Sequence, residues 1–319
     1  MNASWKMQRF NNGCFVACIA MLLAGEGLEF EDYQLYSALK LNLRVKYLPE
    51  TDSLIAGPLC LDHDCSMLRP FLSRYGLEFC DRHFGSFQEF KEELARALSD
   101  GKCVVSGLPF SCIPSPLYSG GGEGGHAVVF YARQGELLSF YDPSGGIARD
   151  KNWTFSEAER YVDHKISIQY LYKALAARKS FVIGSLERKS GIKPAAAGSF
   201  SSEELLRETA SALNVFMLKT AELTRKAEAA GGRLPYDEFM DFTLRFVKPL
   251  AMDWNDALRA AGEGTQPALK LRPLLDSLKA LFLSEQKQLK ISGTLSSGFP
   301  GEFTVSAQKI TASLGCINR

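Results

Sequence analysis

One nearly uninterrupted apolar segment, CFVACIAMLLAG at residues 14–25, constrains the fold of this chain more than any other feature. Residues that are small or apolar on every side are typical of a helix that is buried all round. Gly25 and Gly27 provide the stop signal that ends this helix. Cys14 is therefore expected in the first turn of a buried helix, where the partial positive charge of the N–H groups favours a thiolate over a thiol.

Further helices are predicted in the first hundred residues, at 29–43, 63–76 and 86–101. In the last of these, Ser86 precedes Glu89 by three positions, as in a capping box. Strand patterns rich in Val, Phe, Tyr and Ile then follow at 103–108, 126–133, 136–143 and 165–172. The predicted fold class of the first domain is therefore α+β, with a helical half followed by an antiparallel sheet.

A second, mainly helical domain is predicted after a linker. Residues 186–200 are polar or small, which is typical of a linker. Helical patterns follow at 201–230, 235–262 and 267–290. Pro249 and Pro273 are expected to kink or divide the last two helices. The 319 residues are therefore expected to form domains at 1–185 and 201–319.

Charge and hydropathy argue against two classes of partner. The chain has 37 Lys and Arg against 36 Asp and Glu, so its formal net charge of +1 gives no field that would attract nucleic acid or anionic lipid. No apolar run is long enough to span a bilayer, and the first residues lack the apolar core of an export signal, which predicts a cytoplasmic protein. In that reducing compartment the eight cysteines are expected to be free thiols.

Three other residues are candidate catalytic partners of Cys14. His126 opens a strand after a loop (109–125) rich in Pro and Gly, which is expected to line the site and leave the imidazole accessible as a base. Asp142 ends the next strand, and a hairpin turn at RQGE would bring it to the same end of the sheet as His126. Gln8 has a side-chain amide that could join the Cys14 N–H in binding an oxyanion.

The segment QRFNNGCFVACIAM resembles the nucleophile segment of the double-glycine leader peptidases attached to bacteriocin exporters. The positions that match this family are Gln8, Cys14, Ala17, Cys18, Ala20 and Met21. The segment GGHAVVFYARQGELLSFYDPSGG is similar to the family's Gly-His-strand-turn-strand-Asp-Pro block. The resemblance implies a papain-like cysteine protease fold in which Cys14, His126 and Asp142 form a triad and Gln8 contributes to the oxyanion hole.

Two features favour a different substrate from that of the leader peptidases. Phe15 stands where the family has glycine, and a bulky side chain beside the nucleophile is expected to crowd a peptide main chain. The domain order, and the loop LPFSCIPSPLYSGGGEGGH, resemble the butirosin biosynthesis protein H type of acyltransferase, which has a mainly helical carboxyl-terminal region. This resemblance implies amide formation by transfer of an acyl group from a carrier-protein thioester to an amine, as in natural-product biosynthesis.

The leading hypothesis is thus a cysteine acyltransferase whose partners are an acyl or peptidyl carrier protein and a small amine, with no cofactor. The first alternative is a cysteine peptidase of the leader-peptidase type, in which water replaces the amine. The second is a catalytically dead papain-like binding domain. The cluster CLDHDC at 60–65 matches no zinc spacing well, so it is interpreted as a turn that enters the next helix, and no metal is expected.

Overall fold

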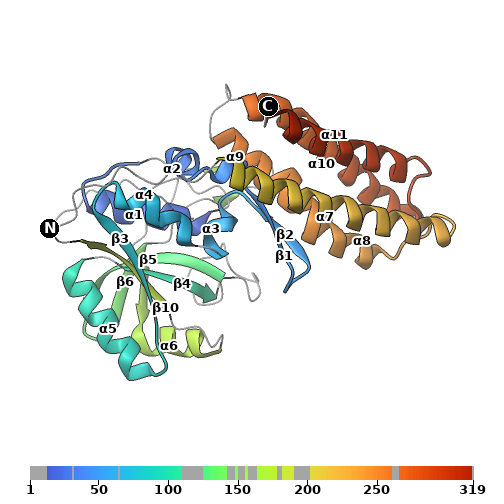
Figure 1. The fold of residues 1–319 in the computed structure, drawn as a ribbon. Coiled ribbons are helices and arrows are strands. Elements are labelled where there is room, and N and C mark those ends of the chain that lie inside the picture. The colour runs from blue at the N-terminus through green and yellow to red at the C-terminus, as the bar shows by residue number, and fades with distance from the viewer. Residues whose placement is uncertain are drawn as a thin grey trace. The chain divides into compact units, whose positions relative to one another are not determined.

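Figure 1 shows the fold in a computed structural model, which describes residues 13–30, 32–63, 65–101, 103–109, 125–141, 148–149, 155–156, 164–177, 182–189, 202–260 and 266–317. The chain forms two compact units. The first comprises Met1–Leu35 and Cys65–Gly198, and the second comprises Tyr36–Asp64 and Ser199–Arg319. This division differs from the predicted domain boundaries, because Tyr36–Asp64 belongs to the second unit.

A six-stranded antiparallel sheet organises the first unit. Its strands, in spatial order, are β3 (Leu77–His83), β10 (Val182–Arg188), β4 (Cys103–Pro109), β5 (Gly125–Gln134), β6 (Leu137–Tyr141) and β9 (His164–Ser167). A separate two-stranded pair consists of β7 (Ala148–Arg149) and β8 (Phe155–Ser156). This combination of helices with an antiparallel sheet is that of an α+β fold.

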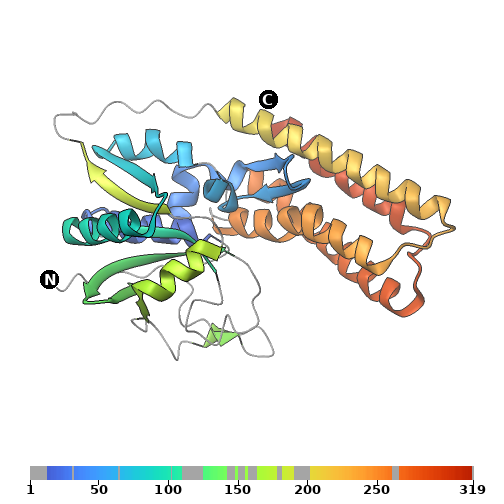
Figure 2. The same ribbon diagram turned by 90° about the horizontal axis from the view of Figure 1, so that it is seen from below.

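Helices cover both faces of this sheet. Helices α5 (Phe87–Asp100) and α6 (Ile168–Ala177) lie on one face and α1 (Cys14–Gly25) lies on the other (Figure 1). Seen from below, α5 in teal and α6 in yellow-green lie in front of the strands (Figure 2). Phe90 and Leu94 of α5 share one apolar cluster with Val128 and Phe130 of β5, which anchors α5 to the sheet.

The predicted hairpin of β5 and β6 is confirmed. Gln134 pairs with Leu137, which leaves Gly135 and Glu136 as a two-residue turn. Gly135 has a φ of 61°, in the left-handed region that a short hairpin turn requires and that glycine adopts without steric cost. The strand predicted at 103–108 is also present, as β4.

The strand predicted at 165–172 is wrong in its second half. The strand β9 ends at Ser167, and the helix α6 begins at Ile168. Ile168, Leu171 and Leu175 are fully buried, and their spacing of three and four residues is the period of a helix face. The predicted linker at 186–200 also begins too early, because β10 continues to Arg188 and pairs along its whole length with β3.

The buried helix predicted at 14–25 is confirmed as α1. Every residue from Phe15 to Leu23 is buried. The helix ends as expected, because Gly27 adopts a φ of 79° and the Leu28 N–H donates to the Leu23 carbonyl at 2.9 Å. A helix buried on all sides needs partners on all sides, so α1 is a fixed element in the core of its unit.

The other early helices are shorter than predicted. They are α2 (Asp32–Ala38), the 3₁₀ turn η1 (Leu41–Leu43), α3 (Leu59–His63), the 3₁₀ turn η2 (Cys65–Met67) and α4 (Leu68–Ser73). The predicted cap of α5 is present, since Ser86 Oγ accepts from the Glu89 N–H at 3.3 Å. Within the described parts of the chain, no helix has the length and hydropathy needed to cross a bilayer.

The second unit is a helical bundle with one β-hairpin. Its elements are β1 (Val45–Leu48), β2 (Ser53–Ala56), α7 (Ser202–Ala229), α8 (Tyr236–Phe242), the π-helical segments η5 (Thr243–Val247) and η6 (Pro249–Trp254), α9 (Asn255–Ala260), α10 (Gln266–Ser292) and α11 (Phe299–Ile317). Pro249 begins a π-helical segment, as its missing N–H allows, whereas Pro273 lies inside the continuous helix α10. The sequence patterns did not predict α11.

The hairpin joins this unit because its residues complete the helical core. Val45, Leu54 and Ala56 are buried among apolar side chains of the helices. The Thr209 hydroxyl of α7 accepts from the Val45 N–H at 2.9 Å and donates to the Leu43 carbonyl at 2.8 Å. The hydroxyl therefore satisfies two backbone polar groups at the start of β1, one N–H and one carbonyl.

One buried carboxyl in η6 predicts a pH-dependent stability of the second unit. Asp253 is only 5% exposed, and burial raises the pKa of its carboxyl to about 6. The folded state then holds this proton more tightly than the unfolded state does, so stability is highest at low pH and falls as pH rises from about 4 to about 6. Asp253→Asn should therefore raise the free energy of unfolding by about 1–3 kcal/mol at pH 7.5, with little effect at pH 4.

Urea unfolding of both proteins at pH 4 and at pH 7.5 measures this difference. Asp237→Asn, at an exposed position of α8, is the matched control and should give the same small change at both pH values. A gain for Asp253→Asn that does not depend on pH would contradict the prediction.

Candidate functional site

Cys14 is the first residue of α1, and it is partly exposed. Gly13 precedes the helix as its N-cap and has no side chain that could accept from the first-turn N–H groups. The Gly13 carbonyl accepts the first helical hydrogen bond, from the Ala17 N–H at 3.0 Å. The positive end of the helix therefore lies beside Cys14 with no capping side chain at the N-cap position, an environment that suits negative charge.

The strand β5 brings a backbone donor to the Cys14 sulfur. The Ala127 N–H donates to Cys14 Sγ at 3.3 Å. Because Ala127 directly follows His126, standard bond lengths place the His126 Cα within about 6 Å of this sulfur. That distance is short enough for an imidazole to span. The structure thus brings Cys14 close to the His126 backbone, and the N–H donor stabilises negative charge on sulfur.

A β-bulge in β4 shapes the start of β5. The register shifts between Val105 and Leu108, so that one extra residue of β4 lies opposite Ala127. Gly107, inside this irregularity, has a φ of 75°. Bulges change the direction in which neighbouring side chains point. The bulge lies directly beside His126, which pairs with Leu108.

The burial of His126 differs from the expectation. The sequence predicts an accessible imidazole, but His126 is only 3% exposed. Cys14 is the more exposed member of the pair. The sulfur of Cys14 is therefore partly open to solvent, whereas the His126 side chain is screened from it.

Phe15 does not crowd the nucleophile in the way that the sequence suggests. The side chain is 5% exposed, and its ring packs edge to face against Phe79 of β3, with the centroids 5.6 Å apart. The ring is therefore part of the core between α1 and the sheet. The expectation that Phe15 obstructs a peptide main chain loses its structural basis.

The remaining predicted site residues lie outside the described residues. These are Gln8, Asp142, the adjoining Pro143 and positions 110–124 of the loop. The strand β6 is described as far as Tyr141, which pairs with Val129 of β5. The hairpin that the triad prediction requires is present to that point, and the roles of Asp142 and Gln8 stay predictions.

Four of the other described cysteines have environments that disfavour reaction, whereas Cys65 is partly exposed. Cys18, Cys60 and Cys103 are fully buried, and burial raises the pKa of Cys103 to about 12. Burial, followed by the charges of Glu187 and Glu78, also raises the pKa of the half-buried Cys80. Thiolate is the reactive form, so these thiols are expected to be slow nucleophiles.

Iodoacetamide should therefore label Cys14 before the other described cysteines at pH 7.5. We expect a rate at least about tenfold above that of Cys80, because a helix N-terminus and an N–H donor favour the Cys14 thiolate. Peptide mass mapping of a time course measures each site separately. Similar slow rates at all sites would instead support the binding-domain hypothesis.

The predicted turn at CLDHDC is part of a short helix and does not provide a described metal site. Cys60 belongs to α3, and its thiol lies 3.8 Å from the Ile55 carbonyl oxygen in a small apolar cluster. The side chains of Asp62, His63 and Asp64 lie outside the described residues. Among the side chains that are described, no group of three His, Cys, Asp or Glu could hold a metal ion.

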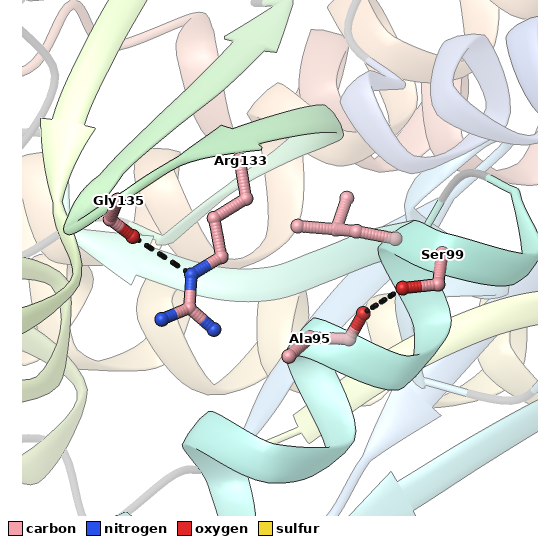
Figure 3. A pocket seen from close by; sticks show the side chains of 5 residues that line it. Ala95, Ser99, Arg133 and Gly135 are labelled. Carbon is pink, nitrogen blue, oxygen red and sulfur yellow. Dashed lines mark hydrogen bonds between the residues drawn. The ribbon is translucent and has the colours of Figure 1, made fainter.

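An open depression on the first unit lies away from Cys14. Its volume is about 430 Å³, and its lining includes Ser99 of α5 and Arg133 and Gly135 at the hairpin end of β5 (Figure 3). Arg133 Nε donates to the Gly135 carbonyl at 2.8 Å. Seven residues of extended strand separate Arg133 from His126, or roughly 20 Å. This depression is therefore not part of the Cys14 site.

Comparisons with known proteins do not assign a family. No protein-family model matches the chain, and no curated protein matches it. Among solved structures, the chain is similar to a Bacillus anthracis protein whose assignment as a C39-like peptidase is itself provisional. The identity is 16%, the match covers 60% of this chain and 98% of that protein, and the TM-score is 0.36. A TM-score of this size supports no argument about fold or activity.

Proposed function

We propose that the protein is a cysteine enzyme in which Cys14 forms an acyl-enzyme and His126 transfers protons. The observation that supports this proposal is the contact between the Ala127 N–H and Cys14 Sγ, which brings a partly exposed thiol at a helix N-terminus next to a histidine. Asp142 would orient the imidazole, and Gln8 would join the Cys14 N–H as an oxyanion donor. No step requires a cofactor.

The reaction has two halves. In the first, the Cys14 thiolate attacks the carbonyl carbon of a thioester, the bond to the donor sulfur breaks, and the leaving thiolate takes a proton from His126. In the second, an amine attacks the acyl-enzyme, His126 accepts its proton, and the Cys14 thiolate leaves. The product is an amide. Both tetrahedral intermediates carry an oxyanion that the N–H donors stabilise.

An amide-forming acyltransferase is our first candidate, with a carrier protein as donor and a small amine as acceptor. The support is the mainly helical second unit, which matches the carboxyl-terminal region expected from the resemblance to the butirosin-type acyltransferases. Screening of the imidazole from solvent is also suited to an acyl-enzyme that must wait for an amine rather than react with water.

A cysteine peptidase is the second candidate, and one specific observation favours it. Phe15 packs into the core against Phe79, so it gives no reason to reject a peptide main chain beside Cys14. The peptidase uses the same residues, and water takes the place of the amine. The two candidates differ only in the donor and in the second nucleophile.

The fate of the acyl-enzyme separates these candidates. For a transferase, we expect a mixture of acyl thioester and amine to give amide at least about tenfold faster than free acid, because a positioned acceptor has a large effective concentration. Product analysis by mass spectrometry measures both products, with Cys14→Ala as the blank. Cys14-dependent cleavage of a peptide, with no amide formed from any thioester, would instead establish the peptidase.

A further inference from the structure

The first turn of α1 is held by an aromatic contact as well as by β5. Phe15 follows Cys14 directly, and its ring meets the Phe79 ring at an interplanar angle of 84° with the centroids 5.6 Å apart. Such edge-to-face pairs add to the stabilisation that burial alone provides. Phe79 belongs to β3, an edge strand of the six-stranded sheet. The contact therefore links the residue next to the candidate nucleophile to an edge strand of the sheet.

Phe79 can occupy this place because residue 184 of β10 is glycine. A Cβ on Gly184 would lie 2.3 Å from Phe79 Cζ and 2.8 Å from its Cε2, well inside contact distance. Gly184 pairs with Asp81 of β3 on one side and with Val104 of β4 on the other. The backbone at 184 therefore cannot retreat without breaking pairs on both sides, so it is the Phe79 ring that would have to move.

Movement of that ring would be transmitted to the nucleophile. Phe15 is almost fully buried and packs against Phe79, so it must follow the ring or lose the contact. The helix α1 packs against β4, β5 and β10, and the Ala127 N–H holds the Cys14 sulfur at 3.3 Å. A shift of the first turn by a fraction of an ångström would alter that hydrogen bond.

We infer that Gly184 and Phe79 are positioning residues that place the Cys14 sulfur against the start of β5. Neither residue is assigned a contact with substrate, and both act through Phe15. The inference rests on the proposed function, because the placement matters only if Cys14 is the nucleophile. Geometric errors near 1 Å can cost a catalytic arrangement about a hundredfold, so small movements are sufficient.

The rate of Cys14 alkylation as a function of pH tests this inference in the whole protein. Gly184→Ala should slow iodoacetamide labelling of Cys14 at neutral pH by about tenfold and displace the midpoint of its pH profile. In the double variant with Gly184→Ala and Phe79→Leu, the labelling rate of Cys14 should be within about threefold of the rate in Phe79→Leu alone. The reason is that the leucine side chain leaves room for the new Cβ at residue 184. A defect at residue 184 that does not act through the Phe79 ring would not be rescued in this way.

Gly85→Ala is the matched control in the same unit, since its Cβ would meet only Glu89 Oε2 at 3.9 Å. It should leave the labelling rate and the pH profile unchanged. Circular dichroism and thermal unfolding establish that each variant is folded. If Gly184→Ala does not fold, the single variant Phe79→Leu tests the inference. Labelling of Cys14 in that variant should be about threefold slower than in the wild type.

The outcomes separate the inference from the proposed function. The inference is wrong if folded Gly184→Ala keeps the wild-type labelling rate and pH profile of Cys14, or if Phe79→Leu does not rescue it. Where Gly184→Ala does not fold, an unchanged labelling rate in Phe79→Leu overturns the inference. Each of these results leaves the proposed function in place. A wild-type Cys14 that reacts no faster than Cys80 overturns the proposed function, and the inference with it.

Discussion

Replacement of Cys14 by alanine is expected to lower turnover by at least about 10⁴-fold. Cys14 combines partial exposure, a helix N-terminus and a backbone N–H donor to sulfur. Removal of the sulfur removes the atom that forms the covalent intermediate, so no residual route through an acyl-enzyme exists. Initial rates for wild type and variant, at equal concentrations of folded protein, measure the effect.

Cys18→Ala is the matched control for this substitution. Cys18 lies one turn later on the same helix and is fully buried, so its loss can cost stability but removes no reacting atom. Turnover should stay within about threefold of wild type in the folded protein. If Cys14→Ala retained turnover while Cys18→Ala lost it, the nucleophile would be assigned to the wrong residue.

Replacement of His126 by alanine is expected to lower turnover by about 10²- to 10⁴-fold, the usual contribution of general acid and base catalysis. The effect is smaller than that of Cys14→Ala, because a thiolate stabilised by the helix and by the Ala127 N–H keeps part of its nucleophilicity without a base. His126 is 3% exposed, so stability must be measured beside activity.

Recovery of activity by added imidazole separates the loss of a catalytic base from the loss of packing around residue 126. A small base that enters the space left by the side chain should recover part of the activity of His126→Ala and should have no effect on Cys14→Ala. His83→Ala is the control, because the His83 side chain is 75% exposed and should be dispensable. Full activity of His126→Ala without imidazole would remove this histidine from the mechanism.

Local patterns in the sequence predicted the elements that position the candidate site. The apolar composition of α1, the two-residue turn at Gly135 and the Ser86 cap each depend on neighbouring residues, so a single sequence contains the necessary information. The helix α6 was mistaken in part for a strand, because Ile and Tyr favour strands while the burial of Ile168 and Leu171 follows a helical period.

Elements that depend on distant partners were not predicted. The strand β3 carries charges at Glu78, Asp81 and Arg82, so its pattern does not resemble a buried strand, and it is completed by β10 about a hundred residues later. The hairpin of β1 and β2 is short, and its apolar residues find their core only in helices of the second unit. Local propensity carries no information about such partners.

At the candidate site, too, features that depend on distant contacts were not predicted. Sequence order and motif predict Cys14 and His126 as partners, and that pairing stays a prediction. They did not predict the burial of His126 or the packing of Phe15 against Phe79. The Ala127 N–H was missed because a backbone donor has no signature in the side-chain sequence. Gly184 resembles any strand glycine until the Phe79 ring is seen in the space of its missing Cβ.

Acylation of Cys14 would be visible in the mass of the protein, first intact and then after digestion. The protein is mixed with acyl thioesters, including acyl-carrier thioesters, quenched in acid and digested. We expect an added mass equal to one acyl group, located on the peptide that contains Cys14 and absent from Cys14→Ala. An adduct on Cys65 or Cys80 with Cys14 unmodified, or turnover that continues with no adduct on Cys14, would contradict this expectation.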